Sequence, residues 1–506
     1  MKSIGSRKTR HLLLLAVFSI ALVVSACAPA APAGSADTQT SEGKEIVISI
    51  APGAYYPSEP TEDNPNPPTF FKTLAAEYEA AHPGVKIELV EVPQTVSGDT
   101  WRVTVFQGGT EPHIINNNYI RVWQEASNDW YVPLNDYLEQ PNPYTPEGTP
   151  GSERWKDSIP DVVWDTTVDA NGNQYLTTVD AVAVGYFYNK AIFEEVGIPT
   201  ELVTDTSLWT DWESMLADLA KLKDAGYEPL ALSMSTATPY NYNWFDGTTL
   251  TSVYRDKIES MWEPDAQWHA MNQHEVACAI QNGILSANDG EFSDWIDILA
   301  NFEPYWISGY TSATPDEAYR LFINGDSPIL LANAANDMER VLRDAEFDFG
   351  VSYFPPVDAK TSEYAANVDT AYLVGGFTSG YAMTDRARRE GIEDEVIDFL
   401  MFITAQPQWS RVVLDAPRSV PTLLGLDIPE ALLPLVNFLD LPIRAFKDPD
   451  PRLTKRYGEE HRRLMQEYFS EQISKEDLIA AEDRLMTSEA EKLIAENEWD
   501  CAFQLE

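Results

Sequence analysis

The chain has 506 residues, of which 80 are acidic and 35 are Lys or Arg, so its formal net charge is −45 at pH 7. A chain this acidic repels phosphate backbones and anionic lipids, which argues against electrostatic binding to nucleic acid or to a charged membrane. The hydrophobic content of 44% and the aromatic content of 11% are typical of a globular protein. This length is long for one hydrophobic core and favours two lobes.

The N-terminus has the pattern of a secretory signal, in which a basic stretch precedes a short apolar run. That run, from Leu12 to Val24, is shorter than the ~20 apolar residues that a membrane-spanning helix needs. It ends in Val24-Ser25-Ala26-Cys27, which resembles the lipobox of bacterial lipoproteins. We therefore expect residues 1–26 to be a lipoprotein signal peptide and Cys27 to carry acyl chains. An ordinary signal peptide with a chance cysteine is the alternative.

Residues 27–44 are rich in Ala, Pro, Gly, Ser and Thr and nearly lack large apolar side chains. Such a segment cannot bury enough surface to offset its ordering entropy, which predicts a flexible tether and a folded part that begins at Glu45. Since two or more acyl chains hold a protein stably on a membrane, we expect an exported protein anchored by lipid to the outer face of the bacterial cytoplasmic membrane.

Hydrophobic periodicity predicts alternating strands and helices along the chain. The first elements are a strand at 45–50, a helix at 71–78 stopped by His82-Pro83-Gly84, and a strand at 85–89. They make a βαβ unit, so we expect an α/β fold with a parallel sheet covered by helices. Later predicted elements are a strand at 181–188, a helix capped by Thr210 and Glu213, a strand at 230–234, a helix starting at Thr314 to Glu317, a strand at 329–332, a helix at 387–404 and a helix-rich tail from Lys455.

Eight segments, in order along the chain, resemble the family 1 extracellular solute-binding proteins, the group typified by maltose-binding protein. They are Phe71 to Pro93, Tyr131 to Leu138, Val184 to Pro199, Trp209 to Leu230, Leu321 to Ala334, Phe349 to Val357, Gly375 to Met383 and Ile397 to Val413. The resemblance implies an α/β, two-lobed periplasmic-binding-protein-like fold of type II, with a hinge and a ligand cleft between the lobes. It also implies hinge crossings near 178–180, 329–331 and 375–377.

On this resemblance the first lobe is discontinuous. It comprises residues 45–179 and 331–376, and the second lobe comprises 180–330 and 377–506 with a helical C-terminal extension. The chain departs from the family after the strand at 329–332, where Gly-Pro-Trp is common and this sequence reads Asn333-Ala334-Ala335-Asn336. A tryptophan that can stack on a sugar is therefore missing at that place.

Sugar recognition needs flat aromatic faces for the ring and fixed amide, carboxylate or guanidinium groups for the hydroxyls. The aromatic, asparagine-rich stretch from Tyr240 to Asp246 is expected to be a loop that supplies such faces, with core packing as the alternative for any one aromatic. Asn116 to Asn118 can bond hydroxyls or form a turn, and Arg418 can bind ligand or make a structural ion pair. The predicted ligand-binding residues are Tyr55, Tyr56, Asn117, Asp180, Trp244, Phe245, Asn333, Gly376 and Arg418.

The residues and the resemblance together predict a monomeric solute-binding lipoprotein of an ABC importer. It is expected to capture a carbohydrate without a cofactor or metal and to deliver it to permease subunits in the membrane. A peptide or a polyamine is the alternative ligand. A secreted glycoside hydrolase is the alternative class, although nothing selects a pair of catalytic carboxylates, and the sequence lacks G-x-S-x-G, phosphate-loop and H-E-x-x-H motifs.

Two cysteines remain beyond Cys27, and export exposes thiols to oxidation. We predict a disulfide between Cys278 and Cys501 that pins the C-terminal tail, with two separate thiols as the alternative. His274 and Cys278 stand at i and i+4 and could bind a metal together with His269, although such residues meet more often by chance.

Overall fold

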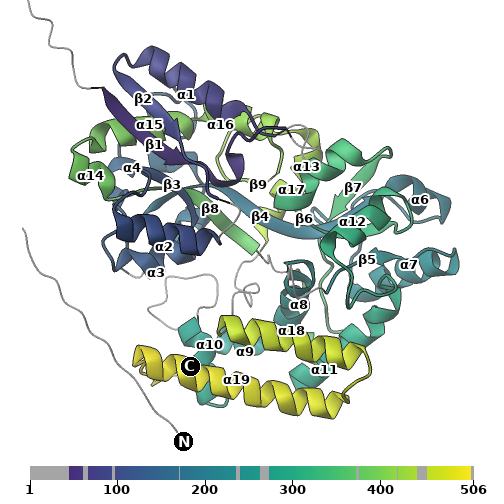
Figure 1. Cartoon of the computed structure of the whole chain (residues 1–506). Helices are drawn as coiled ribbons and strands as arrows, with labels where there is room; N and C mark the ends of the chain where they lie inside the picture. The colour runs from purple at the N-terminus through teal and green to yellow at the C-terminus, as the bar shows by residue number, and fades with distance from the viewer. Residues whose placement is uncertain are drawn as a thin grey trace, which may run out of the picture. The chain divides into compact units, whose positions relative to one another are not determined.

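The computed structural model describes residues 45–60, 67–93, 97–169, 171–234, 240–261, 273–371, 375–418, 420–441 and 453–502. The predicted signal peptide, Cys27 and the tether lie outside these ranges. Figure 1 shows strands covered by helices, as the periodicity predicted, and the α/β class is confirmed. No helix in the described ranges is both long enough and apolar enough to cross a membrane.

The folded part begins with the predicted βαβ unit. β1 (Ile46–Ala51) and β2 (Val85–Leu89) pair in parallel, and α1 (Phe70–Ala81) connects them. β3 (Ile114–Asn118) pairs in parallel with β1 and follows α2 (Gly98–Gly108). α1 buries the positions whose helical spacing predicted it, namely Phe71, Leu74, Ala75 and Tyr78. The parallel strands are therefore confirmed.

The long strand β4 (Leu176–Asn189) connects two groups of strands (Figure 1). The first strand group contains β1, β2, β3 and β8 (Gly375–Met383), which is antiparallel to β3 and to residues 176–183 of β4. The second strand group contains β5 (Leu230–Ala231), β6 (Ile329–Asn333) and β7 (Phe349–Ser352). In that group β6 and β7 are antiparallel to residues 184–189 of β4.

β4 is irregular where it passes between the two groups. Its pairing with β8 shifts register between Thr178 and Asp180 and again between Asp180 and Val182. The short strand β9 (Val420–Pro421) pairs with β4 at the same place. Such irregularities bend a strand and increase its twist. The first crossing predicted from the resemblance, at 178–180, coincides with this irregularity.

The two strand groups divide the chain at other places than the predicted lobe boundaries, which stay a prediction. β7 falls within 331–376, which was assigned to the first lobe, but it belongs to the second strand group. Most of β8 lies beyond residue 377, which was assigned to the second lobe, but it pairs with β3. α15 (Glu393–Ile403) and α16 (Gln406–Asp415) also contact α1. The physical reason is that pairing between distant strands leaves no local pattern in the sequence.

The remaining helices pack on these strands or on one another. They are α3 (Tyr119–Ala126), α4 (Asn135–Leu138), α5 (Asp161–Thr167), α6 (Lys190–Glu195), α7 (Trp212–Asp224), α8 (Tyr240–Val253), α9 (Arg255–Ser260), α10 (Gln273–Gln281), α11 (Gly290–Phe302), α12 (Pro315–Ile323), α13 (Ala334–Asp344), α14 (Arg386–Glu390), α17 (Leu433–Val436), α18 (Lys455–Phe469) and α19 (Lys475–Asn497). The 3₁₀ helices are η1 (Gly53–Tyr55), η2 (Trp155–Ser158), η3 (Glu303–Tyr305), η4 (Glu363–Ala365), η5 (Glu430–Leu432) and η6 (Asn437–Asp440).

The predicted helix ends are partly right. Thr314 and Glu317 form the expected capping box of α12. The box of α7 is formed one residue later than predicted, by Asp211 and Ser214, because spacing alone cannot choose between two overlapping pairs and a carboxylate is the better N-cap. The single helix predicted at 387–404 is broken into α14 and α15 by Gly391, whose φ of 73° ends the first helix.

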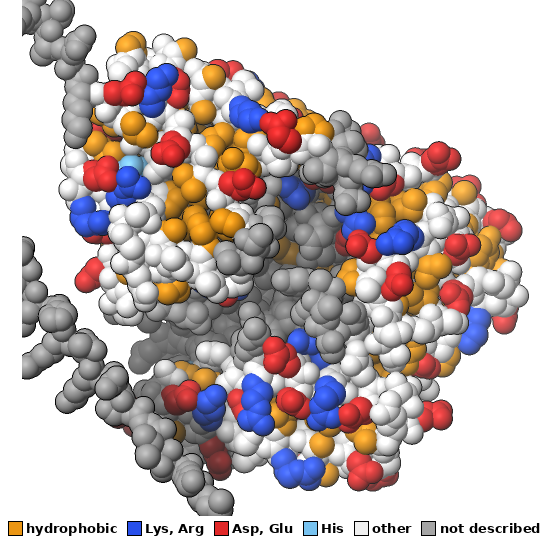
Figure 2. All heavy atoms as spheres, viewed as in Figure 1, with side chains coloured by type: hydrophobic (Ala, Val, Ile, Leu, Met, Phe, Trp, Pro, Cys, Tyr) orange, Lys and Arg blue, Asp and Glu red, His pale blue; other side chains and the backbone are white. Residues whose placement is uncertain are grey.

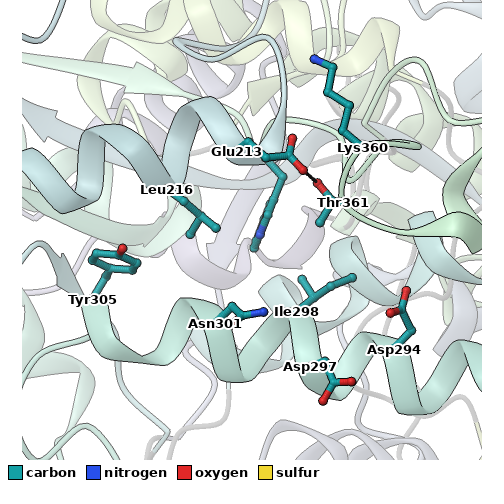
Figure 3. Close-up of a pocket in the computed structure, with 10 residues that line it drawn as sticks. Glu213, Leu216, Asp294, Asp297, Ile298, Asn301, Tyr305, Lys360 and Thr361 are labelled. Carbon is teal, nitrogen blue, oxygen red and sulfur yellow. Dashed lines mark hydrogen bonds between the residues drawn. The ribbon is translucent and has the colours of Figure 1, made fainter.

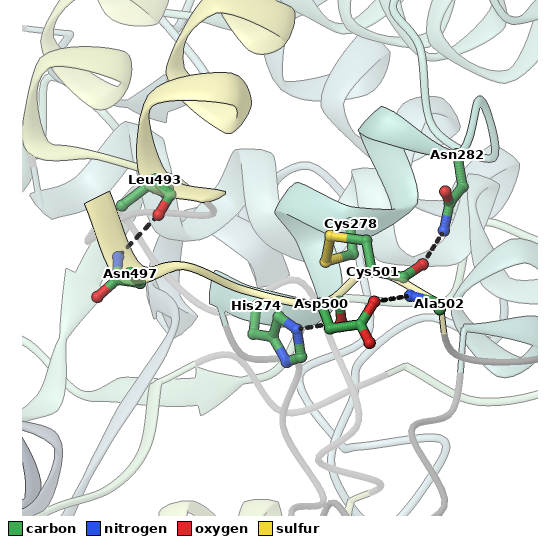
Figure 4. Close-up of a disulfide and its surroundings, with 8 residues drawn as sticks. All are labelled: His274, Cys278, Asn282, Leu493, Asn497, Asp500, Cys501 and Ala502. Atoms are coloured by element: carbon green, nitrogen blue, oxygen red, sulfur yellow. Dashed lines mark hydrogen bonds between the residues drawn. A yellow bond between two sulfur atoms is a disulfide. The ribbon is translucent and has the colours of Figure 1, made fainter. Parts of the chain in front are cut away.

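The helix-rich tail folds as a hairpin of α18 and α19, drawn in yellow in Figure 1 over α8 to α11. Cys278 in α10 and Cys501 after α19 are joined by a disulfide, with their Cα atoms 5.1 Å apart and 223 residues of sequence between them (Figure 4). Nδ2 of Asn282 donates to the Cys501 carbonyl at 2.9 Å.

The disulfide also bears on the metal-site alternative. His274 lies beside the two sulfurs, but these are bonded to each other and are not thiolate ligands. His269 lies outside the described residues.

Candidate ligand-binding site

Two predicted site residues meet beside the irregular part of β4. Tyr55 ends η1, the turn after β1, and its hydroxyl donates to Oδ2 of Asp180 at 3.0 Å. Both side chains are buried, and the Tyr55 ring packs edge-on against Trp409 of α16 at 5.5 Å. The turn after β1 is therefore attached to β4 at the point where β4 leaves the first strand group. Tyr56, the next residue, is half-buried.

Asn116 lies against the same turn. Gly53 has a φ of 63°, and a Cβ added to it would lie 2.6 Å from Oδ1 of Asn116, so only glycine fits there. Asn116 is directly opposite Tyr381 in the β3–β8 pair, and the Tyr381 hydroxyl donates to the Pro52 carbonyl at 3.4 Å. Nδ2 of Asn116 is buried and has no hydrogen-bond partner within the described ranges. A buried amide donor left without a partner is suited to a ligand hydroxyl.

The predicted contact at Asn117 has a different environment. Neighbouring residues of a strand point to opposite faces, so Asn117 faces away from Asn116. Nδ2 of Asn117 donates to the Tyr131 hydroxyl at 3.1 Å, and its Oδ1 accepts from the Asn118 amide at 2.9 Å. Tyr131 in turn donates to Glu125 at 2.7 Å. Both side-chain groups of Asn117 are therefore bonded within the first strand group, whereas Asn116 lies on the face that meets the turn carrying Tyr55.

Tyr381 stays a hydrogen-bond donor in this environment. Its burial, and then the nearby Tyr55 and Asp180, raise the pKa of the Tyr381 hydroxyl well above its ordinary value. The proton therefore remains on the hydroxyl at all physiological pH values, and the bond to the Pro52 carbonyl persists. This bond fixes the turn that presents Tyr55.

Arg418, in the segment before β9, contacts the same turn after β1. Its Nη1 donates to the Ala54 carbonyl, and its Nε lies 3.8 Å from Oε2 of Glu339 in α13. The guanidinium thus links the turn after β1 to α13. This arrangement includes the structural ion pair that was the alternative interpretation of Arg418, and it attaches the guanidinium to the backbone of the residue before Tyr55.

For four other predicted residues the structure describes only the backbone. Asn333 pairs with Val184 of β4, and Gly376 pairs with Val182. Trp244 and Phe245 lie in α8, which contacts β4 and β6. The prediction of a loop at Tyr240 to Asp246 is wrong, because tertiary packing of a helix outweighs the weak turn preference of Asn and Gly. Tyr55, Asp180, Asn333 and Gly376 therefore lie on or beside β4, and α8, which carries Trp244 and Phe245, also contacts this strand.

A pocket of about 410 Å³ lies elsewhere, between α7, α11 and the loop at 360–361 (Figure 3). It is lined by Trp212, Glu213, Leu216, Asp294, Asp297, Ile298, Asn301, Tyr305, Lys360 and Thr361. Its polar side chains mostly bond one another or adjacent elements: Thr361 donates to Glu213, Ser362 to Asp294, Lys360 pairs with Asp211, and Lys475 pairs with Asp297 at 2.7 Å. None of the predicted site residues lines this pocket.

The sequence matches the bacterial extracellular solute-binding proteins over residues 63–378, and the chain belongs to this family. The resemblance found in the sequence is thereby confirmed. Members of this family are binding proteins rather than enzymes, and they are extracellular. No curated protein sequence is similar enough to count as a match.

Solved structures of solute-binding proteins share the fold. A chitin oligosaccharide binding protein is 17% identical, covers 88% of this chain and 100% of its own, and has a TM-score of 0.60. The solute-binding protein RafE in complex with raffinose is 14% identical, with the same coverages and TM-score. The binding protein MsmE from Bacillus subtilis, in an open conformation, is 13% identical, covers 90% and 99%, and has a TM-score of 0.62. At these identities the likeness shows the two-lobed fold alone.

Proposed function

We propose that this protein is an exported lipoprotein of an ABC importer that binds a carbohydrate and delivers it to membrane permease subunits. The observation that carries the proposal is the meeting of Tyr55, Asp180 and Asn116 at the irregular middle of β4, where the two strand groups join. Family membership supports the binding role. The names of the similar structures, which include a chitin oligosaccharide binding protein and a raffinose complex, support the carbohydrate class.

The chemistry around β4 suits a neutral sugar. Carboxylate and amide groups at Asp180 and Asn116 match ring hydroxyls, and the half-buried Tyr56 and the aromatic stretch of α8 at 244 and 245 are the residues that we propose to offer flat faces to the C–H side of the ring. Figure 2 shows acidic and basic side chains interspersed over the visible described surface, and the whole chain has a net charge of −45. This charge disfavours phosphorylated or sulfated ligands.

In the proposed mechanism the two lobes close on the ligand about β4 and its neighbours, and the permease recognises the closed form. Part of the binding free energy drives closure, so the apparent affinity depends on the fraction of molecules that can close. Acyl chains on Cys27 and the tether of residues 28–44 keep the binding protein next to its permease. No covalent step is needed.

A binding screen tests the proposal. Purified mature protein is screened by thermal shift against galactose, raffinose, chitin oligosaccharides, xylo-oligosaccharides, short peptides and polyamines, and hits are measured by calorimetry. A sugar that raises the melting temperature in a concentration-dependent way supports the proposal. If only a polyamine or a peptide raised the melting temperature, that ligand class would replace the carbohydrate in the proposal.

Two variants and one assay sharpen the result. Asn116→Ala and Trp244→Ala should weaken sugar binding by about tenfold or more, and Asn301→Ala in the pocket of Figure 3 is the control that should bind normally.

The glycoside hydrolase alternative is tested by incubating the protein with the same oligosaccharides. Release of reducing ends would favour it, whereas stoichiometric binding without turnover favours the transport role.

A further inference from the structure

A buried charged cluster joins the C-terminal hairpin to α8. Nε2 of His461 in α18 lies 3.0 Å from Oδ2 of Asp246 in α8, and Nδ1 lies 2.9 Å from Oε1 of Glu482 in α19. The three residues are 4%, 1% and 0% exposed, respectively. The Tyr457 hydroxyl donates to the same Glu482 oxygen at 2.5 Å. The two helices of the C-terminal hairpin and the distant helix α8 therefore meet at one imidazole ring.

The partners of His461 define its charge. Ionised carboxylate oxygens only accept hydrogen bonds, so both ring nitrogens must carry protons to bond Asp246 and Glu482. Burial by itself disfavours the charged ring, but Glu482 and Asp246 outweigh it and raise the pKa of His461 to about 9. The ring is thus a cation between two carboxylates at neutral pH. Because it is buried from solvent, it cannot act as an acid or base on a ligand.

A second contact holds the same face of α8. The Trp295 ring of α11 stacks on His461 with centroids 6.2 Å apart, and Nε1 of Trp295 donates to Oγ1 of Thr249 at 2.9 Å. Asp246 and Thr249 are three residues apart in α8 and therefore lie on one side of that helix. α8 is fixed from this side by a hydrogen-bonded indole and by an ion-paired imidazole.

The helix held in this way carries the aromatic stretch. Trp244 and Phe245 are the two residues before Asp246 in α8, and α8 also contacts β4 and β6. A shift of the helical turn that contains Asp246 moves residues 244 and 245 with it. We propose that His461 is a positioning residue for ligand binding, which sets the placement of α8 against β4 through its bridge to Asp246. The ligand part of this inference rests on the proposed function.

The hairpin offers a matched control. Glu489 of α19 is 1% exposed and lies 2.7 Å from Nη1 of Arg456, and it also accepts from Thr454 at 2.5 Å. All these partners belong to the hairpin or the residue that caps it. Glu489→Gln therefore weakens an ion pair of the hairpin, between a buried carboxylate and the exposed Arg456, without touching α8. His461→Gln and Asp246→Asn weaken the bridge to α8 from its two ends.

Two readouts separate positioning from general stability. Hydrogen exchange of peptides covering 240–253 is measured without ligand, and calorimetry is run with raffinose and a chitin oligosaccharide. All three variants should melt below the parent protein. His461→Gln leaves two buried carboxylates without their cation, Asp246→Asn removes one of the two carboxylates that pair with His461, and Glu489→Gln removes the buried carboxylate that pairs with Arg456. His461→Gln and Asp246→Asn should raise exchange in α8 and weaken sugar binding by about tenfold. Glu489→Gln should do neither.

Each outcome decides a defined point. The inference would be overturned if the hydrogen exchange of α8 were equal in His461→Gln and Glu489→Gln. It would also be overturned if α8 exchanged faster in His461→Gln but this variant bound sugar as tightly as the parent protein. If the parent protein binds neither sugar, the proposed carbohydrate function loses its support, and exchange of α8 alone decides whether His461 positions that helix. If His461→Gln does not fold, Asp246→Asn, which keeps the side-chain shape, carries the same test.

Discussion

Two buried histidines, one beside the first strand group and one in the C-terminal hairpin, have pKa values that are shifted in opposite directions. His113 lies just before β3 in the first strand group and is 1% exposed; His461 lies in the C-terminal hairpin and is 4% exposed. The Ser49 amide donates to Nδ1 of His113 at 3.0 Å, so that nitrogen is unprotonated, and Nε2 lies 3.2 Å from Glu390. Burial, and then the nearby Arg386, hold the pKa of His113 below its ordinary value.

The comparison shows that burial alone does not determine the charge of a histidine. A backbone amide can only donate, and it keeps His113 neutral. Two carboxylates can only accept, and they keep His461 charged.

The two regions are also held together differently. Paired strands hold His113 in place, whereas the hairpin depends on a disulfide and on buried ion pairs. Perturbations of these two regions should therefore have opposite pH dependence and unequal size.

The largest expected effect comes from breaking the covalent link of the hairpin. In the chain-entropy model a disulfide that closes a loop of 223 residues contributes about 5 kcal/mol to the free energy of unfolding. The double variant Cys278→Ser, Cys501→Ser should lose most of this, measured by urea unfolding. Hydrogen exchange should rise in α10 and α19 and stay unchanged in β1 to β3. Unchanged stability after verified reduction of the parent protein would contradict this expectation.

The charge of His461 should make stability fall at high pH. A histidine whose pKa is raised from 6.5 to about 9 stabilises the folded state fully below pH 6.5 and loses that contribution as pH rises through 9. The shift corresponds to about 3 kcal/mol. The difference in unfolding free energy between the parent and His461→Gln should shrink by that amount between pH 6 and pH 9.5. A difference that is constant with pH would show that folding does not raise the pKa of His461.

Steric packing should dominate at the turn of the first strand group. Gly53→Ala places a Cβ 2.6 Å from Oδ1 of Asn116 at a φ of 63°, and we expect a loss of about 2 kcal/mol in unfolding free energy. Gly172→Ala is the control, because Gly172 has a φ of 78° but no atom within 4 Å of the added Cβ. Both variants share the backbone strain, so equal losses would mean that the contact with Asn116 contributes nothing.

The smallest expected effect is that of His113, and its sign is opposite. Since the pKa of His113 is held below 6.5, its contribution to stability is present above pH 6.5 and is lost as pH falls through the lowered value. Side-chain NMR of histidine-labelled protein can follow both rings in one titration. His113 should titrate below 6.5 and His461 near 9. If both titrated together near 6.5, the contrast between the two regions would be disproved.

Much of this architecture was predictable from local patterns. The βαβ unit of β1, α1 and β2 follows from apolar spacing and from the His82-Pro83-Gly84 stop, and the capping box of Thr314 and Glu317 correctly begins α12. Both signals act over fewer than about ten residues, through helix and strand periodicity and hydrogen bonds at helix ends. The pairing of Cys278 with Cys501 was expected for a different reason, because two cysteines in an exported chain leave few alternatives.

The candidate site was harder to predict because it depends on long-range contacts. Tyr55 and Asp180 were chosen separately, and only the fold brings the hydroxyl within 3.0 Å of the carboxylate. Asn117 was predicted as a ligand contact from the run of asparagines at 116 to 118, but the sequence does not say which of them lies on the face of β3 that meets the Gly53 turn. The stretch at Tyr240 to Asp246 was expected to be a loop because its Asn and Gly residues favour turns, but Asp246 is buried against His461 and the segment is helical.

By itself, the sequence determined the family, the alternation of helices and strands, the signal-like N-terminus and the cysteine partners, because each rests on the order of residues or on short-range periodicity. Only the tertiary structure decided which strands share a sheet, which asparagine faces the turn after β1, and which buried histidine is charged. These properties depend on donors and acceptors from distant segments. Asp246, His461 and Glu482 are separated by 215 and 21 residues and acquire their shared charge only when three helices pack together.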